Sequence, residues 1–186
     1  MSFLKKRSLV FYLGFFLILT MAIGGAAIGA FADSGGATAS VHAGTLTETG
    51  TFGESVSATL DGTNQTIPYT LPVQVKDATG SGGGWNLTIS GTALSDGVAG
   101  QPTLTQQVSA ATSSCVSGNS CTNATSATPP TYPVVISSTA QKFFSADANS
   151  GRGILNVSST VQVVIPGDAY AGSYSTTLSL AVVSGP

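Results

Sequence analysis

Side chains that could carry acid–base or nucleophilic chemistry are scarce in this chain of 186 residues. The only histidine is His42, and Glu48 and Glu54 are the only glutamates. An enzyme needs a base, a nucleophile or a metal ion held at a defined spacing. His42 lies in a stretch of small residues, and the eight carboxylates lack the alternating spacing of a calcium loop. The sequence therefore predicts a protein that is not an enzyme and that has no cofactor and no metal site.

The two cysteines, Cys115 and Cys121, enclose a Ser-Gly-Asn sequence that is typical of turns. Two thiols in an exported chain are expected to pair. A redox-active pair would instead need a nearby cation or a helix terminus to activate one thiol, and the sequence predicts neither at this place. We therefore predict a structural disulfide that closes a hairpin or a loop tip.

Hydroxyl groups take the place that charged groups usually have on the surface of a domain. Charged residues make up 8% of the chain, against about a quarter in an average soluble domain. Serine and threonine make up 46 of the 154 residues from 33 to 186. The net charge of −2 excludes the basic face of a nucleic-acid-binding protein, and recurrent apolar runs disfavour intrinsic disorder. This composition is typical of a β-rich extracellular domain.

The N-terminus is predicted to direct export. Three basic residues at positions 5–7 precede an apolar run from Leu9 to Ala32 that ends in Ala-Phe-Ala. These features define a secretory signal peptide, so we predict a signal helix over residues 1–32 that is cleaved after Ala32. The alternative is an uncleaved anchor, because the run is long enough to span a bilayer. Residues 33–43 are predicted to be a flexible linker, and the chain from residue 33 onward carries 3 − 8 = −5 charges.

From residue 44 onward, apolar and polar residues alternate with the period of two that indicates β-strands. The segments with this pattern are 55–60, 69–76, 85–91, 132–137, 161–166 and 174–182. Pro72 lacks an N–H group, which predicts a sheet edge or a bulge at that position. The short connection 167–172 predicts that the last two strands are antiparallel neighbours. Residues 44–186 are thus predicted to be all-β, an antiparallel β-sandwich of the Ig-like or Greek-key type.

Residues 93–133 do not follow this pattern clearly. They are rich in Ser, Thr, Ala, Gly and Pro, and a Thr-Pro-Pro sequence cannot belong to a central strand. We interpret this region as an insertion within the domain, with short strands around Leu104–Thr105 and at the disulfide.

Two short motifs carry a resemblance to a known family. Trp85-Asn86-Leu87 is a Trp-x-Leu triplet, and the segment from Tyr174 to Leu178 reads Tyr-x-x-x-Leu near the C-terminus. Between them a Gly-x-Gly sequence at 151–153 and a hydrophobic segment ending at Pro166 follow in order. With this ordered set the chain resembles the WxL domain of Gram-positive bacterial cell-surface proteins. It differs from the family pattern in its cysteine pair, in its Ser/Thr/Pro-rich insertion and in lacking a Thr-Trp after the distal motif.

The resemblance implies a secreted cell-surface protein held non-covalently on the cell wall. The implied partners are peptidoglycan or another wall glycan, together with other cell-surface proteins. Nucleic acid is not a partner, and the membrane is one only if the signal segment stays uncleaved. The alternative function is a structural surface or matrix subunit that assembles through its sheet edges.

The motif residues Trp85, Leu87, Tyr174 and Leu178 have two interpretations. Each fits the apolar face of its strand, where a buried indole would contribute a large area and need a partner for its N–H group. Alternatively, Trp85 is partly exposed and stacks on sugar rings. If both aromatic residues belong to the core, binding falls to the Ser/Thr/Asn-rich loops and to Tyr170.

Overall fold

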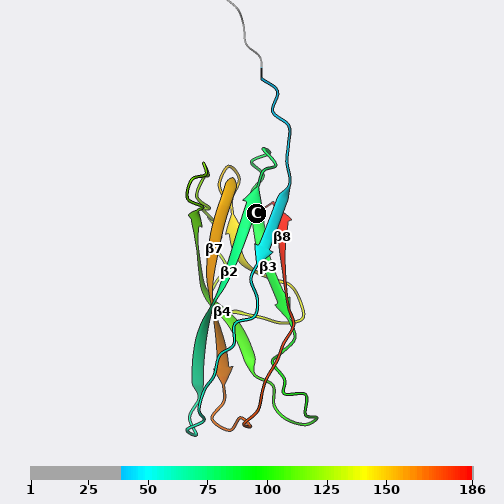
Figure 1. The fold of residues 1–186 in the computed structure, drawn as a ribbon, viewed down its shortest axis with the longest axis vertical. Coiled ribbons are helices and arrows are strands. Elements are labelled where there is room, and N and C mark those ends of the chain that lie inside the picture. Colours follow the sequence, from blue (N-terminus) through cyan, green and yellow to red (C-terminus); the bar gives the residue numbers. More distant parts are fainter. Residues whose placement is uncertain (1–38, 186) are drawn as a thin grey trace, which may run out of the picture. The chain divides into compact units, whose positions relative to one another are not determined.

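The computed structural model describes residues 39–185, and these form an all-β domain in which no helix occurs (Figure 1). Within this part of the chain there is accordingly no helix that could cross a membrane. The predicted signal helix, and the linker up to residue 38, lie outside the described residues. The strands are β1 (Leu46–Gly50), β2 (Gln65–Asp77), β3 (Trp85–Gly91), β4 (Thr105–Cys115), β5 (Val134–Val135), β6 (Gln141–Ala146), β7 (Gly153–Ile165) and β8 (Leu178–Ser184).

The strands form two antiparallel sheets around a shared core. The larger sheet has the order β1-β2-β7-β4-β5, and the smaller has the order β6-β3-β8. β1 contacts β8 on one side and β5 contacts β6 on the other, so the larger sheet curls around the smaller one (Figure 1). The prediction of an all-β antiparallel domain is confirmed, and the fold is sandwich-like with a half-barrel curl. The finer Ig-like or Greek-key assignment stays a prediction.

Period-two alternation places one face of each long strand in the core. β2 and β7 pair over their full length of 13 residues, from Gln65 opposite Ile165 to Asp77 opposite Gly153. The main core is formed by buried residues of β2, β3, β4, β6 and β7, with Ile136 beside them: Leu71, Val73, Val75, Trp85, Leu87, Ile89, Val108, Ile136, Phe143, Ala146, Val157 and Val161. A smaller cluster at the far end of β7 consists of Leu94, Leu104, Val163, Ile165 and Ala169.

The predicted strand at 55–60 is wrong, and the prolines of β2 explain why. β1 ends at Gly50, and its ladder with β2 ends in one further bond, from Thr51 N–H to Pro72 O at 3.1 Å. Pro72 cannot return that bond, and Pro68 lacks an N–H group on the same side of β2. In the segment that follows β1, Gly53 has a φ of +117°, which lies outside the range of a β-strand. Residues 51–60, which we call the strap, therefore run beside β2 without pairing to it (Figure 1).

Three further differences concern the second half of the chain. The region 93–133 contains the 11-residue strand β4, which pairs with β7 inside the larger sheet, so the prediction of only short strands there is wrong. The segment after β7 crosses to the other sheet, and β7 and β8 are not neighbours as predicted. The last strand begins at Leu178 rather than at Tyr174, and only Val134–Val135 of the segment 132–137 is a strand.

Candidate functional site

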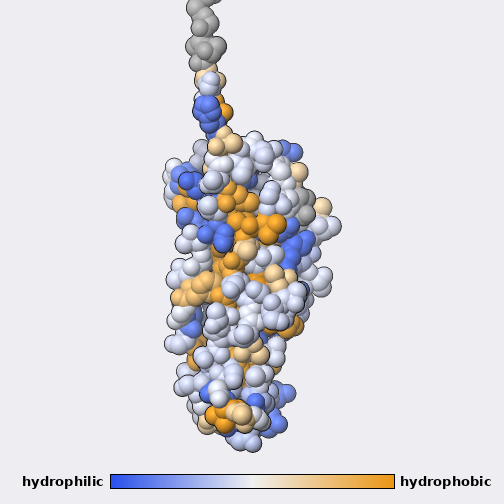
Figure 2. All heavy atoms as spheres, turned by 90° about the vertical axis from the view of Figure 1, so that its right-hand side faces the viewer, coloured by the Kyte–Doolittle hydropathy of each residue, from blue (hydrophilic) through white to orange (hydrophobic). Residues whose placement is uncertain are grey.

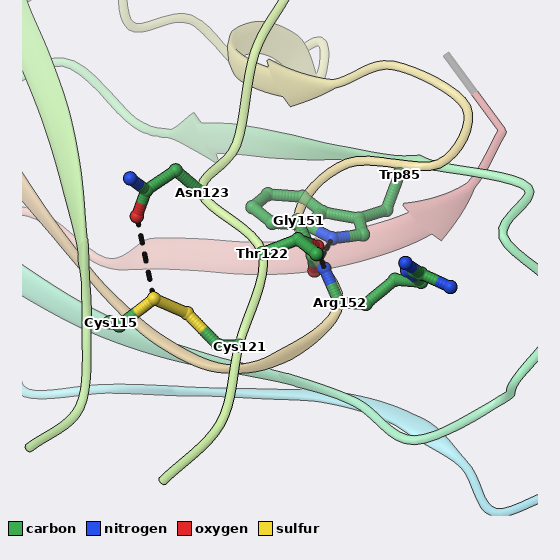
Figure 3. The surroundings of a disulfide bond; sticks show 7 residues. All are labelled: Trp85, Cys115, Cys121, Thr122, Asn123, Gly151 and Arg152. Atoms are coloured by element: carbon green, nitrogen blue, oxygen red, sulfur yellow. Dashed lines mark hydrogen bonds between the residues drawn. A yellow bond between two sulfur atoms is a disulfide. The ribbon is translucent and has the colours of Figure 1, made fainter.

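Trp85 begins β3 and is fully buried, with 0% of its surface exposed. Its Nε1–H donates a hydrogen bond of 2.8 Å to the carbonyl of Gly151 (Figure 3), and its ring lies 5.9 Å from that of Phe144. Leu87, two residues further along β3 on the same face, is equally buried. The indole therefore has the burial and the polar partner of a core residue, and the alternative of an exposed stacking platform is wrong.

The predicted disulfide between Cys115 and Cys121 is present. It joins the end of β4 to the segment after Cys121, which lies beside the turn at Gly151 that covers Trp85 (Figure 3). After the disulfide, Thr122 N–H donates to Arg152 O at 2.9 Å, and Arg152 N–H donates to Thr122 Oγ1 at 2.9 Å. Gly151 N–H donates to the carbonyl of the next residue in this segment, Asn123, at 3.2 Å. The disulfide thus holds the segment that fixes the turn over the indole.

The close packing of this turn requires glycine. Gly151 has a φ of +65°, and a Cβ atom there would lie 2.8 Å from Nε1 of Trp85. Gly153 has a φ of +93°, and a Cβ atom there would lie 2.7 Å from the carbonyl oxygen of Ser120. The Gly-x-Gly sequence therefore allows the turn to approach both the indole and the disulfide loop.

The distal motif lies at the opposite end of the β3–β8 pair. β3 and β8 pair from Trp85 opposite Ser184 to Gly91 opposite Leu178, a length of about 20 Å at the usual rise of a strand. Tyr174 packs against the smaller apolar cluster, and its hydroxyl donates to the carbonyl of Tyr170 at 3.0 Å. Leu178 packs against the main core. The two motifs therefore do not form one site, and each holds one end of the smaller sheet.

An open groove of about 510 Å³ lies beside the distal motif. One wall is the segment from Tyr174 to Leu178, and the other is β2 at Tyr69 and Leu71. Residues 51–56 of the strap form its third side, and Gln106 of β4 lies among its lining residues. The strap continues from β1 beside this part of β2, and the groove is bounded by the strap, by inward-facing residues of β2 and by residues 174–178.

The interior of the groove contains a buried polar pair. Gln106 is only 6% exposed, and its Oε1 accepts a hydrogen bond of 3.0 Å from the Tyr69 hydroxyl. Burial raises the pKa of Tyr69, so this phenol stays a hydrogen-bond donor throughout the physiological pH range. The amide group of Gln106 thus lies beside the Tyr69 hydroxyl among the lining residues of the groove.

The strap carries apolar side chains but is attached weakly. Phe52 is 46% exposed, and Val56 is also exposed although both line the groove. Two hydrogen bonds join the strap to the rest of the described chain: the bond from Thr51 N–H to β2, and one of 2.7 Å from Gln65 Nε2 to the carbonyl of Thr59. Phe52 thus lines the groove from a segment with few hydrogen bonds to the rest of the described chain.

Residues that sequence reasoning weighed for catalysis are not brought together. His42 is exposed before β1, and Glu48 is on β1 with its side chain half-buried. Glu54 lies on the strap and is the one carboxylate that lines the groove. In the described part of the chain, no three His, Cys, Asp or Glu residues lie close enough together to share a metal ion. Sequence reasoning missed Phe52, Tyr69 and Gln106, because their shared location depends on the gap beside β2.

Comparison with known protein families gives a match over most of the chain. A family model described as "WxL domain surface cell wall-binding" matches residues 37–186, which includes both motifs and all eight strands. The search of curated proteins found no match. The ordered motifs, the fold that they hold together and this match across most of the chain place the protein at the cell surface, as a member of the WxL family of cell-wall-binding domains.

Proposed function

We propose that this domain attaches the protein non-covalently to the wall by binding peptidoglycan or another neutral wall glycan. The family binds the cell wall, and the surface chemistry of this member favours an uncharged ligand. The described residues include three cationic side chains, Lys76 on β2, Lys142 on β6 and Arg152 before β7, against seven carboxylates. Lys76 lies opposite Ile154, two residues from Arg152, at one end of the β2–β7 pair, whereas Lys142 lies on the smaller sheet. The described residues thus offer two neighbouring cations at most, and the carboxylates outnumber the cations.

Polar uncharged side chains cover the outer face of the larger sheet instead. Gln74 and Asn156 hydrogen-bond across β2 and β7 at 3.3 Å, and Gln107 and Gln162 do so across β4 and β7 at 3.1 Å. Figure 2 shows another side of the molecule, where most of the surface has intermediate hydropathy, strongly hydrophilic atoms are scattered and hydrophobic atoms gather along the middle of the face. Hydroxyl and amide groups can exchange their hydrogen bonds with water for bonds to sugar hydroxyls without desolvating a charge. This scarcity of charge is the observation that supports a neutral glycan.

The proposal is tested by sedimentation of the exported protein with purified wall material. We expect it to sediment with peptidoglycan from which teichoic acids and proteins have been removed. We also expect the bound fraction to stay the same between 50 mM and 1 M NaCl, because at 1 M the screening length is about 3 Å. A protein that remains in the supernatant with every wall preparation, or one that is released by salt, would contradict the proposal.

The alternative of a surface subunit that assembles through sheet edges is less well supported. Beyond the end of β1, β2 presents Pro68, and proline at an edge prevents another strand from pairing there. Size-exclusion chromatography separates the two functions, since an assembling subunit would elute as a large species in the absence of any glycan.

A further inference from the structure

We propose that the strap is a lid that closes over the groove by placing the side chain of Phe52 inside it. The strap is attached near its two ends, by the bond from Thr51 N–H to β2 and by the bond that the carbonyl of Thr59 accepts. Between these two attachments, residues 52–58 make no hydrogen bond to other parts of residues 39–185. A segment with so few restraints can move without unfolding the sheet beside it.

Apolar surface is left uncovered on both sides of the groove. On the strap, Phe52 is 46% exposed and Val56 is 36% exposed. On the other side, the five members of the smaller apolar cluster keep 4–9% of their surface exposed, whereas all of the main core except Ile136 keeps 0–1%. Two members of the smaller cluster, Leu94 and Val163, line the groove. Inward movement of Phe52 would cover both surfaces at once, and the removal of apolar surface from water favours this movement.

The groove has room for the ring of Phe52. Its volume of about 510 Å³ equals that of roughly seventeen molecules of liquid water, at about 30 Å³ each. The inserted ring would meet Leu71 and Leu178, which line the groove and pack in or against the main core. Strand pairing cannot hold the strap instead, because Pro68 and Pro72 of β2 lack the N–H groups that a ladder needs. Closure by side-chain insertion is therefore the movement that this part of the fold allows.

Gly53 provides the hinge next to Phe52. Its φ of +117° lies in a region that residues with a side chain rarely adopt. A Cβ atom at this position would meet no other atom within 4 Å, so the strap needs glycine here for its backbone conformation and not for space. Closure changes this φ to a negative value and moves Phe52 from the rim of the groove to its interior.

The strap in this way controls access to the groove. When it is closed, the ring of Phe52 covers Leu71 and the wall formed by residues 174–178, and when it is open these surfaces face solvent. Ordering the strap costs backbone entropy, which opposes the gain from burying the ring. Because the two contributions oppose each other, both positions are populated.

The proposal is tested on the exported protein by hydroxyl-radical footprinting, which measures the exposure of aromatic side chains. Gly53→Ala disfavours the open position about tenfold through its positive φ, so oxidation of Phe52 should fall at least about twofold relative to the wild type. Tyr170 is the internal reference, since it is 58% exposed and lies outside the groove. Gly100→Ala is the matched control, because Gly100 has a φ of +85° and open space around it but lies outside the strap, and it should leave Phe52 oxidation unchanged.

A second variant tests whether the ring of Phe52 enters the groove itself. Thr177 is exposed and lines the groove, so Thr177→Phe should occupy part of its volume. Added to Gly53→Ala, this change should restore the oxidation of Phe52 to the wild-type level. A double variant in which Phe52 stays protected would contradict the proposal, because the ring would then be covered somewhere outside the groove.

Hydrogen exchange of the wild type measures how freely the strap moves. The amides of residues 52–58 should exchange at least about 100-fold faster than those of β7, which has a paired strand on both sides. The proposal is wrong if the two sets exchange equally slowly, or if Gly53→Ala oxidises at Phe52 like the wild type. Loss of the folded circular dichroism spectrum in Gly53→Ala would also contradict it, since the open space around residue 53 predicts a folded variant. None of these measurements uses a wall ligand, so their outcome is independent of the proposed function.

Discussion

Replacing Trp85 with phenylalanine tests whether the Trp-x-Leu motif acts through folding or through recognition. The indole is buried, and its N–H group is bonded to the carbonyl of Gly151. Phenylalanine would leave this acceptor without its partner, at a cost of about 1–3 kcal/mol. The smaller ring would also leave a cavity of roughly 40 Å³, which adds about 1 kcal/mol.

We therefore expect Trp85→Phe to lower the free energy of unfolding by about 2–4 kcal/mol. For a domain of this size the melting temperature should fall by roughly 2–4 °C for each kcal/mol. Urea denaturation followed by circular dichroism measures the change, since the variant has lost the only tryptophan of the chain. Val183→Ala is the matched control, because Val183 is 50% exposed on the neighbouring strand β8, and it should change stability by less than about 0.5 kcal/mol.

The decisive measurement is wall binding at a temperature where the variant is fully folded. If the motif acts through folding, Trp85→Phe sediments with peptidoglycan as the wild type does. A variant with unchanged stability and lost wall binding would refute the assignment of the indole to the core. A variant that loses neither would show that the hydrogen bond to Gly151 and the packing around it contribute little.

Three further predictions follow from other parts of the fold. Changing both Cys115 and Cys121 to serine should lower the free energy of unfolding by about 2 kcal/mol, since the closed loop is short, and fluorescence of Trp85 should shift to the red at lower urea concentration than in the wild type. Replacing Pro68 and Pro72 with threonine restores two N–H donors to β2, and we expect a larger species in size-exclusion chromatography or new amide protection in residues 51–60. An elution volume equal to that of the wild type together with an unprotected strap would contradict the role given to the prolines. The raised pKa of Tyr69 means that the folded state favours the neutral phenol, so its contribution to stability is full below pH 10 and is lost as the pH rises through the folded-state pKa. Tyr69→Phe should reduce this loss of stability at alkaline pH and should cost about 1 kcal/mol at pH 7 through the bond to Gln106; an unchanged alkaline profile would show that this tyrosine is not its source.

Alternation along single strands was predictable because it depends only on which face of a strand meets the core. Segments 69–76, 85–91 and 161–166 are strands for this reason, and their inward faces are buried. The same pattern failed at 55–60, where alternation is present but the neighbouring strand lacks the N–H groups that a ladder requires. It also failed at β4, whose small and polar residues give little contrast between faces although the strand is held on one side by β7 along its length. The local pattern of a segment shows its preference for a β-strand, whereas pairing within a sheet depends on the neighbouring strand.

The groove could not be predicted because it results from a strand that ends early. Pro72 indicates an edge in the sequence, yet β2 has a neighbour on both sides as far as Gly50, and only the end of β1 converts the rest of β2 into an open edge. The distal motif begins at the opposite wall of this opening, because β8 starts at Leu178 and the residues before it leave the sheet. Tyr174 and Leu178 therefore belong to the core and to the lining of the groove at once. Packing the side chains of the distal motif into the core thus also fixes one wall of the groove over which we propose that the strap closes.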